Sequence, residues 1–272
     1  MISETTKQPF DFSGSVPKNY DQYMGPMFFE PYAIEVSKLV DASSVHIALE
    51  LAAGTGRVTR HLRSVLSLGA KLIASDISAD MLGFAKEKLK GLNIDWQIID
   101  AQSLPFEDNT IDLVVCCFGL MFVLDRLKAC SEVHRVLRKD GMFVITTWDK
   151  LETIGTSSVY RMIAEKYLPQ PLPESYNLPS SMHDESMVRD LLKSAGFSRI
   201  AVEKRKVDSQ CRSAKDAAEA FTQAGALSNE IARLNPAWVE EIKLLVEQEL
   251  AERYGDAPMV APMSAVIGQA WK

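Results

Sequence analysis

Short apolar runs alternate with amphipathic segments from residue 45 onward. The runs are rich in β-branched residues, and a strand that is covered on both faces is apolar along its length. The segments between them repeat apolar residues every three or four positions, as one face of a helix does. The predicted strands are 45–51, 71–75, 94–100, 111–118 and 141–148. This alternation predicts an α/β fold with a mainly parallel sheet and helices on both faces.

The pattern changes after residue 148. Residues 151–168 are predicted to be helical, and four prolines in 169–179 predict a loop, because proline lacks the amide that a helix needs. Another helix is expected from its N-cap Asp184 to Gly196. Because residues 213–254 are too long for a hairpin loop, they predict a helical cap between the last two strands. The remaining elements are strands at 198–207 and 259–271 and helices at 213–226 and 236–254, the second with Trp238, Ile242, Leu245, Leu250 and Tyr254 on one face.

Length, composition and charge limit the class of protein. The chain has 272 residues, 47% of them hydrophobic, so a single domain over 1–272 can bury a full core. Its expected parts are an N-terminal segment (1–44), a cofactor-binding core (45–150) and a remainder (151–272). The net charge of −6, the pI of about 5.4 and the lack of a dense lysine and arginine run disfavour nucleic acid and anionic membrane as partners. No run of roughly 18 apolar residues predicts a membrane span.

The cysteines indicate a reducing compartment. Cys116, Cys117, Cys130 and Cys211 form no C-x-x-C pair, and three of them lie in apolar segments. The polar N-terminus, MISETTKQPFDFSGS, has no apolar signal core. These features predict a soluble, cytoplasmic protein. No cluster of histidine and aspartate has the spacing of metal ligands, so we expect no metal site.

A glycine-rich turn follows the first predicted strand. Ala52, Gly54 and Gly56 are small, which lets a ligand approach the backbone, and amides at the next helix start can meet an anionic group. The dinucleotide pattern G-x-G-x-x-G would need a third glycine where Thr59 stands. The pattern E-x-small-x-G-x-G is met instead, beginning at Glu50. Close packing of strand and helix is an equal alternative for this turn alone.

Two aspartates end the next two strands. Asp76 stands 20 residues after Gly56 and can accept hydrogen bonds from ribose hydroxyls. Asp100 can accept from an adenine amino group, with the backbone N–H of Ala101 available to a ring nitrogen. Both lie at the carboxyl edge of the sheet, where open α/β folds bind ligands. Each aspartate taken singly could equally cap a helix, but the glycine turn and both aspartates in register favour an adenosine site.

Together these features resemble the class I S-adenosylmethionine-dependent methyltransferases, in the broad group that includes ubiquinone- and menaquinone-type and many natural-product methyltransferases. The resemblance implies a doubly wound, Rossmann-like sheet of order 3-2-1-4-5-7-6 whose last strand is antiparallel. Ala52 departs from the family, in which glycine is commonest at that position. The residues that carry the resemblance are ELAAGTG (50–56), SDIS (75–78) with Met81, IDAQSLPF (99–106), FEDNTIDLVVCCF (106–118), VLRKDGMFVITTW (136–148) and SAGFSRIAVE (194–203).

The resemblance also implies S-adenosylmethionine as cofactor and methyl donor, and it assigns roles to residues. Glu50 would engage the methionine amino group, helped by the backbone around Ala52 and Gly54 in the loop that closes at Gly56. Asp76 would hold the ribose. The remaining roles concern the adenine and the reacting end of the cofactor: Ile77 and Met81 would flank the adenine, Asp100 and Ala101 would read its edge, and Cys117 and Phe118 would lie near the sulfonium.

The N-terminal stretch NYDQYMGPMFFEPYA (19–33) is aromatic. In similar enzymes such a segment folds over the cofactor as a lid, and a tyrosine such as Tyr20 approaches the methionine end. A helix that docks its aromatic side chains on the core is the equally weighted alternative. With the cap at 213–254, a lid would enclose a small, hydrophobic or aromatic methyl acceptor.

Methyl transfer from a sulfonium depends mainly on proximity and orientation. His183, just before a predicted helix, is the best candidate for a general base, although a structural role is the favoured interpretation. Three alternatives remain: a nicotinamide-dependent oxidoreductase, against which Thr59 argues; a non-catalytic S-adenosylmethionine-binding protein; and an enzyme that uses the same cofactor for other chemistry.

Overall fold

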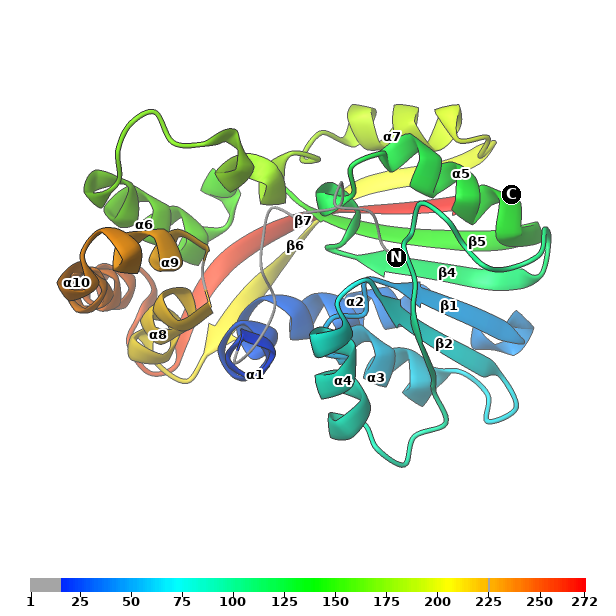
Figure 1. The fold of residues 1–272 in the computed structure, drawn as a ribbon, viewed down its shortest axis with the longest axis horizontal. Coiled ribbons are helices and arrows are strands. Elements are labelled where there is room, and N and C mark those ends of the chain that lie inside the picture. The colour runs from blue at the N-terminus through cyan, green and yellow to red at the C-terminus, as the bar shows by residue number, and fades with distance from the viewer. Residues whose placement is uncertain (1–15, 225) are drawn as a thin grey trace.

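A single β-sheet forms the centre of the molecule. The computed structural model describes residues 16–224 and 226–272, and within them seven strands form one sheet of order β3-β2-β1-β4-β5-β7-β6 (Figure 1). Neighbouring strands from β3 to β5 are parallel, and β7 is antiparallel to both β5 and β6. The strands are β1 (Ile47–Leu51), β2 (Lys71–Asp76), β3 (Asp95–Ile98), β4 (Ile111–Cys117), β5 (Leu137–Trp148), β6 (Arg199–Cys211) and β7 (Met259–Trp271). The predicted strand order and the antiparallel last strand are confirmed.

Helices cover both faces of the sheet and bury its centre. One face carries α2 (Glu30–Lys38), α3 (Arg57–Val65) and α4 (Ala79–Lys88), and the other carries α5 (Arg126–Val136) and α7 (Glu185–Ser194) (Figure 1). Asp184 caps α7 as predicted, since its side chain accepts from the amide of Ser186 at 2.7 Å. In the central strand β4, Val114 and Val115 are completely buried.

Strands β6 and β7 extend beyond the rest of the sheet. Ala265 of β7 pairs with Trp148, the last residue of β5, so residues 259–264 pair with β6 alone. This two-stranded ribbon carries the cap (Figure 1). The cap consists of α8 (Ala214–Ala224), α9 (Ala226–Leu234) and α10 (Pro236–Tyr254), with α6 (Gly155–Ala164) packed against them. The predicted cap is therefore present, but β6 continues to Cys211 rather than 207 and α9 is an additional helix.

The buried face of α10 differs from the predicted one. Ile242 and Leu250 are buried as expected, but Val246 is buried as well, whereas Leu245 is 41% exposed. α10 packs against α6, α8 and α9, and these neighbours decide which side of the helix is covered. The short helices are η2 (Ala42–Ser44), η3 (Leu120–Phe122), η4 (Leu151–Thr153), η5 (Glu165–Tyr167) and, in the proline segment, η6 (Glu174–Ser180).

The N-terminal segment lies between the sheet and the cap. It comprises α1 (Val16–Asn19) and the π-helix η1 (Tyr20–Phe29), and it continues into α2. η1 contacts α8 of the cap on one side and α3 on the other (Figure 1). Residues 1–15, which carry no apolar signal core in the sequence, lie outside the described residues. Within the described part of the chain, no helix has the length and apolar character to cross a membrane.

Candidate functional site

A cavity opens where β1, β2, β3 and β4 end. Backbone of the glycine loop, acidic strand ends and aromatic side chains form its wall, and η1 contributes Tyr20 and Phe29. Tyr32 is fully buried in the core, as the core-docking interpretation of the N-terminal aromatic residues predicts. Tyr20 and Phe29 lie where a lid would place them, and their folding over a cofactor stays a prediction. Eleven of the twelve residues expected to bind the cofactor line this cavity: Tyr20, Glu50, Ala52, Gly54, Asp76, Ile77, Met81, Asp100, Ala101, Cys117 and Phe118.

Gly56, the twelfth, lies outside the cavity lining. It is the N-cap of α3 with φ +79°, a left-handed conformation that favours glycine. A Cβ at this position would lie 2.9 Å from Leu89 Cδ1 and 3.2 Å from Ala85 Cβ. Gly56 therefore lets α3 begin in close contact with α4. It affects the cavity indirectly, through the shape of the glycine loop.

Asp76 connects the glycine loop to the end of β2. Its Oδ2 accepts from the amide of Gly54 and its Oδ1 from the amide of Ser78, both at 2.8 Å. Burial raises the pKa of Asp76, and these amide hydrogen bonds oppose that rise. The carboxylate is thereby held in one orientation at the cavity, with the free lone pairs of both oxygens available to hydroxyl donors.

Glu50 is a buried carboxyl group at the end of β1. The residue is 2% exposed, and burial, together with the negative charge of Asp76, raises its pKa to about 8. Its Oε2 is buried and has no hydrogen-bond partner among the described residues. A buried acceptor without a partner costs free energy until a donor reaches it. Because Glu50 also lines the cavity, this atom fits a positively charged donor such as an ammonium group.

The loops after β3 and β4 are joined through Gln102. Asp100 Oδ1 accepts from the backbone amide of Gln102 at 2.9 Å and from its side-chain amide at 3.1 Å. The side-chain oxygen of Gln102 accepts in turn from the amide of Asp125 at 3.0 Å. This bridge holds Asp100 and Ala101 at the cavity wall opposite the glycine loop.

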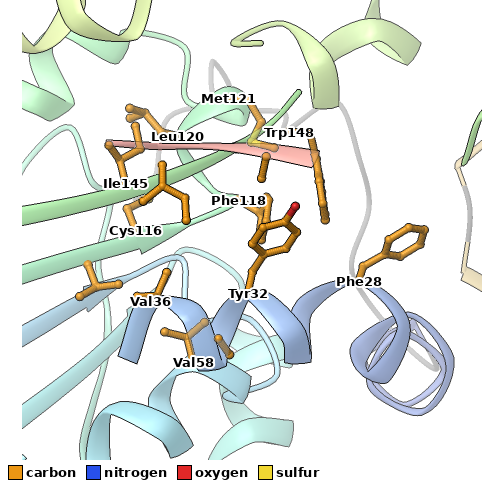
Figure 2. Close-up of a cluster of buried hydrophobic side chains, with 14 of the residues drawn as sticks. Phe28, Tyr32, Val36, Val58, Cys116, Phe118, Leu120, Met121, Ile145 and Trp148 are labelled. Carbon is orange, nitrogen blue, oxygen red and sulfur yellow. The ribbon is translucent and has the colours of Figure 1, made fainter. Parts of the chain in front are cut away.

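An aromatic cluster continues from the cavity toward the cap. The rings of Phe118 and Trp148 stack with centroids 3.9 Å apart and an interplanar angle of 20°. Tyr32 meets both rings edge-on, and Phe28 meets Trp148 from the cap side (Figure 2). Phe118 has φ +55°, an uncommon conformation for a residue with a side chain, which is typical of functional sites.

Two further predicted residues differ in their relation to the cavity. Cys117 lines it, with Sγ 3.6 Å from Thr146 Oγ1, and burial raises the pKa of its thiol, so it is not a nucleophile. His183 does not line it, and its Nδ1 hydrogen-bonds to the carbonyl oxygen of Ser180 at 2.8 Å. Among the described residues, no group of three or more His, Cys, Asp or Glu side chains could hold a metal ion.

Several cavity residues escaped the sequence analysis. Arg57 directly follows the glycine loop, and Gln102 directly follows Ala101, so their positions beside predicted site residues were the available signal. The loop 122–124 carries no comparable motif and reaches the cavity through the fold of the chain after η3. Phe29, by contrast, belongs to the aromatic stretch 19–33 that was expected to form a lid.

Comparison with known proteins identifies the family to which the chain belongs. A family model described as a methyltransferase domain matches residues 49–145. The chain is 30% identical over 204 residues to the ubiquinone/menaquinone biosynthesis C-methyltransferase UbiE of Pseudoalteromonas translucida, a match that covers 69% of this chain and 81% of the relative. Phosphoethanolamine N-methyltransferase 2 of Haemonchus contortus, solved with S-adenosyl-L-methionine, has a TM-score of 0.61 at 16% identity, covering 97% of this chain and 58% of that one.

The chain belongs to the class I S-adenosylmethionine-dependent methyltransferases, and S-adenosylmethionine is its methyl donor. This outcome decides against the nicotinamide-dependent oxidoreductase and against a non-catalytic binding protein. The fold alone would not have excluded other activities, because the [4+2]-cyclase SpnF shares it. That structure has a TM-score of 0.56 at 16% identity over 94% of this chain and 93% of that one.

Proposed function

We propose that this methyltransferase acts on a small, flat, electron-rich aromatic acceptor, of which a quinol or a phenol is the model. The observation that supports this most is the cluster of Phe29, Phe118 and Trp148, which begins at the cavity wall and extends toward the cap. Aromatic side chains favour stacked and edge-on contacts with a planar ring. The UbiE relative, whose name refers to ubiquinone and menaquinone biosynthesis, supports the same acceptor class.

The proposal assigns the cavity residues to parts of the cofactor. Glu50 holds the ammonium group, which supplies the donor that its buried Oε2 lacks. Asp76 accepts from the ribose hydroxyls, and Asp100 with the amide of Ala101 binds the adenine edge. The other lining residues complete the site: Ala52 and Gly54 face the methionine part with their backbone, Ile77 and Met81 flank the adenine, and Tyr20, Cys117 and Phe118 surround the reacting end.

When bound, S-adenosylmethionine supplies an electrophilic methyl carbon on a sulfonium. The protein's part is to orient the acceptor behind that carbon and to exclude water, and orientation can contribute about 7–11 kcal/mol in favourable cases. Burial raises the pKa of Tyr20 and of Cys117 far above neutrality, so neither takes a proton at neutral pH. With the carboxylates assigned to the cofactor, we infer an acceptor that needs no strong base. A phenol or quinol hydroxyl can lose its proton to water, and an electron-rich ring carbon loses its proton to water readily once the methyl group has been added.

A methyl-transfer screen tests the proposal. The full chain is incubated with S-adenosylmethionine and matched sets of hydroquinones, phenols and aliphatic alcohols, and methylated products are measured by mass spectrometry. We expect turnover with the aromatic acceptors. Transfer to aliphatic acceptors only, or to polypeptide or nucleic acid without any small-molecule product, would contradict the proposal.

Two variants sharpen this test. Trp148 lies behind Phe118 and does not itself line the cavity, so Trp148→Phe should act through the position of the Phe118 ring. We expect it to raise the KM for the aromatic acceptor several-fold, more than it changes the affinity for S-adenosylhomocysteine, and Trp238→Phe on α10 is the control. His183→Gln tests the remaining base candidate. Because His183 does not line the cavity, we expect the dependence of kcat on pH to stay unchanged in this variant.

A further inference from the structure

The first residue of α3 is enclosed by the N-terminal segment. Arg57 donates from Nη1 to Glu30 Oε2 at 3.0 Å and from Nη2 to the carbonyl oxygen of Asp21 at 2.6 Å. Its Nε lies 3.3 Å from Asp21 Oδ1, within ion-pair distance, but makes no hydrogen bond among the described residues. All three nitrogens of the guanidinium thus meet η1 or the first residue of α2, while the same side chain lines the cofactor cavity.

A notch in η1 accommodates this guanidinium. A Cβ on Gly25 would overlap Nε, Nη2 and Cζ of Arg57, so a larger residue there would displace the guanidinium from its present position. The amide of Glu30 donates to the carbonyl oxygen of Gly25, five residues back, in the π-helical pattern. This pattern places Gly25 and Glu30 on one face of the π-helix. Asp21, four residues before Gly25, lies on the same face. The π-helix, a form frequent at functional sites, therefore presents a notch and two carboxylates to Arg57.

Further side chains contact both ends of this arrangement. Lys88, the last residue of α4, donates to Asp21 Oδ1 at 2.5 Å, and His61 Nε2 lies 2.8 Å from Glu30 Oε1, which Arg60 also meets. The side chains of Asp21 and Glu30 are 14% and 24% exposed, so salt screens them less than a surface pair. The segment is thus fixed to the two helices that follow β1 and β2.

The fixed segment is also a wall of the cavity. Tyr20 and Phe29 line it, and their rings stack with centroids 5.1 Å apart. Each is the immediate neighbour of an anchoring residue, Asp21 or Glu30. Because each anchor fixes the backbone beside one of these rings, the anchors limit how far the two rings move away from the cavity.

We infer that Arg57 is a positioning residue that locks the strap 20–30 over the cofactor, so that cofactor and product exchange only after the strap leaves the guanidinium. The inference rests on the proposed cofactor site and adds the device that closes it. Arg57 acts through Tyr20 and Phe29, whose positions it fixes, and the Gly25 notch makes the docking specific for this side chain.

The rate of S-adenosylhomocysteine release from the full chain tests this inference by stopped-flow fluorescence. Gly25→Ala fills the notch and Glu30→Gln removes an anchor, and each should speed release at least tenfold. Gly83→Ala is the control for the first, because a Cβ on Gly83 of α4 meets no atom within 4 Å. Glu35→Gln is the control for the second, because Glu35 lies on the same helix but pairs with Arg205 and Lys38.

The outcomes separate the roles that Arg57 could have. Faster release in Arg57→Gln, with no further gain on adding Glu30→Gln, supports the lock, because coupled residues are non-additive. Slower release in Arg57→Lys than in Arg57→Gln also supports it. Unchanged release in Gly25→Ala and Glu30→Gln, with thermal midpoints that show folding, would overturn it, as would weakened binding confined to Arg57 variants. Failure of the wild-type chain to bind S-adenosylhomocysteine would instead overturn the cofactor site itself.

Discussion

The methyl group of Ala52 fills the space that a side chain on Gly119 would need. Ala52 follows β1 and Gly119 follows β4, and these strands are neighbours in the sheet. Ala52 has φ +54°, a left-handed conformation that a residue with a Cβ adopts at a cost of roughly 1–2 kcal/mol. The alanine that departs from the family's usual glycine is therefore matched by a glycine on the adjacent strand end.

This relationship predicts a compensating exchange. Gly119→Ala alone should lower the free energy of unfolding by about 1–3 kcal/mol, as overpacking does. Ala52→Gly relieves the left-handed strain and should be neutral or stabilising by up to about 1 kcal/mol after the entropy of the extra glycine. In the Ala52→Gly background, Gly119→Ala should then cost much less, because Cys116 Sγ at 3.2 Å is the nearest remaining neighbour.

Urea unfolding of the wild type, both single variants and the double variant measures this coupling. Strictly additive free energies would show that the two positions do not compete for one space.

The hydrogen bonds of Asp76 predict a loss of cofactor affinity in Asp76→Asn. An amide group has one acceptor oxygen in place of two, so it cannot serve the amides of Gly54 and Ser78 together with two ribose hydroxyls. We expect S-adenosylhomocysteine to bind about 10- to 100-fold more weakly, or roughly 1.4–2.8 kcal/mol. Isothermal titration calorimetry measures this change in affinity. The control is Asp95→Asn, which removes a carboxylate that pairs with Lys71 at the opposite end of the sheet; an equal loss there would refute a specific role.

The raised pKa of Glu50 predicts proton release on cofactor binding. In the ligand-free protein the carboxyl group is largely protonated at pH 6.5, because its pKa is about 8. An ammonium group beside it favours the ionised form. Binding at this pH should therefore release up to one proton, and affinity should increase with pH until about 8. Calorimetry in buffers of different ionisation enthalpy measures the release, which should vanish in Glu50→Gln. Equal proton release by that variant would assign the effect to another group.

The raised pKa of Glu50 also predicts how the stability of the ligand-free protein changes with pH. The folded pKa of Glu50, about 8, lies above its ordinary value of 4.5, so the folded state binds the proton more tightly. Its contribution to stability is full below about pH 4.5 and is lost as pH rises toward 8, by at most about 1.4 kcal/mol per pH unit. Comparing wild type with Glu50→Gln by urea unfolding at several pH values isolates this slope. A difference that grows in the opposite direction would contradict the assignment.

A buried ion pair where β5 ends predicts a local stability effect. Asp149, with a side chain 3% exposed, accepts from Lys204 Nζ at 2.6 Å and from Ser264 Oγ at 2.8 Å. Lys204→Met leaves this carboxylate with one cation fewer and should cost about 2 kcal/mol, below the range for fully buried pairs because Lys204 is 33% exposed. Lys206→Met, two residues along β6, is the matched control. Equal thermal midpoints for both variants would show that the pair adds no stability.

The strand order could be predicted from the resemblance to a known family. Most residues that line the cavity could be predicted from their positions at the ends of strands. Glu50, Asp76 and Asp100 lie near or just beyond the carboxyl ends of strands in the parallel run, and the carboxyl ends of such strands meet at one edge. Local pattern therefore places these side chains together without knowledge of any distance. The antiparallel β7 was expected only from the resemblance, whereas the cap helices followed from the length and periodicity of the segment between the last two strands.

Contacts between distant segments were decided by the tertiary structure alone. The docking of Gly25 on Arg57, the stacking of Phe118 on Trp148 and the match of Ala52 with Gly119 join residues from separate elements. Periodicity reports which face of an element is apolar, but not which neighbour covers it. The exposed Leu245 on α10 shows the same limit. The sequence by itself determined the class of enzyme, through its resemblance to a known family, and the edge of the sheet where the candidate site lies, because local patterns encode strands and their ends. Only packing in three dimensions decided how the cavity is closed, because closure depends on contacts between surfaces far apart in the chain.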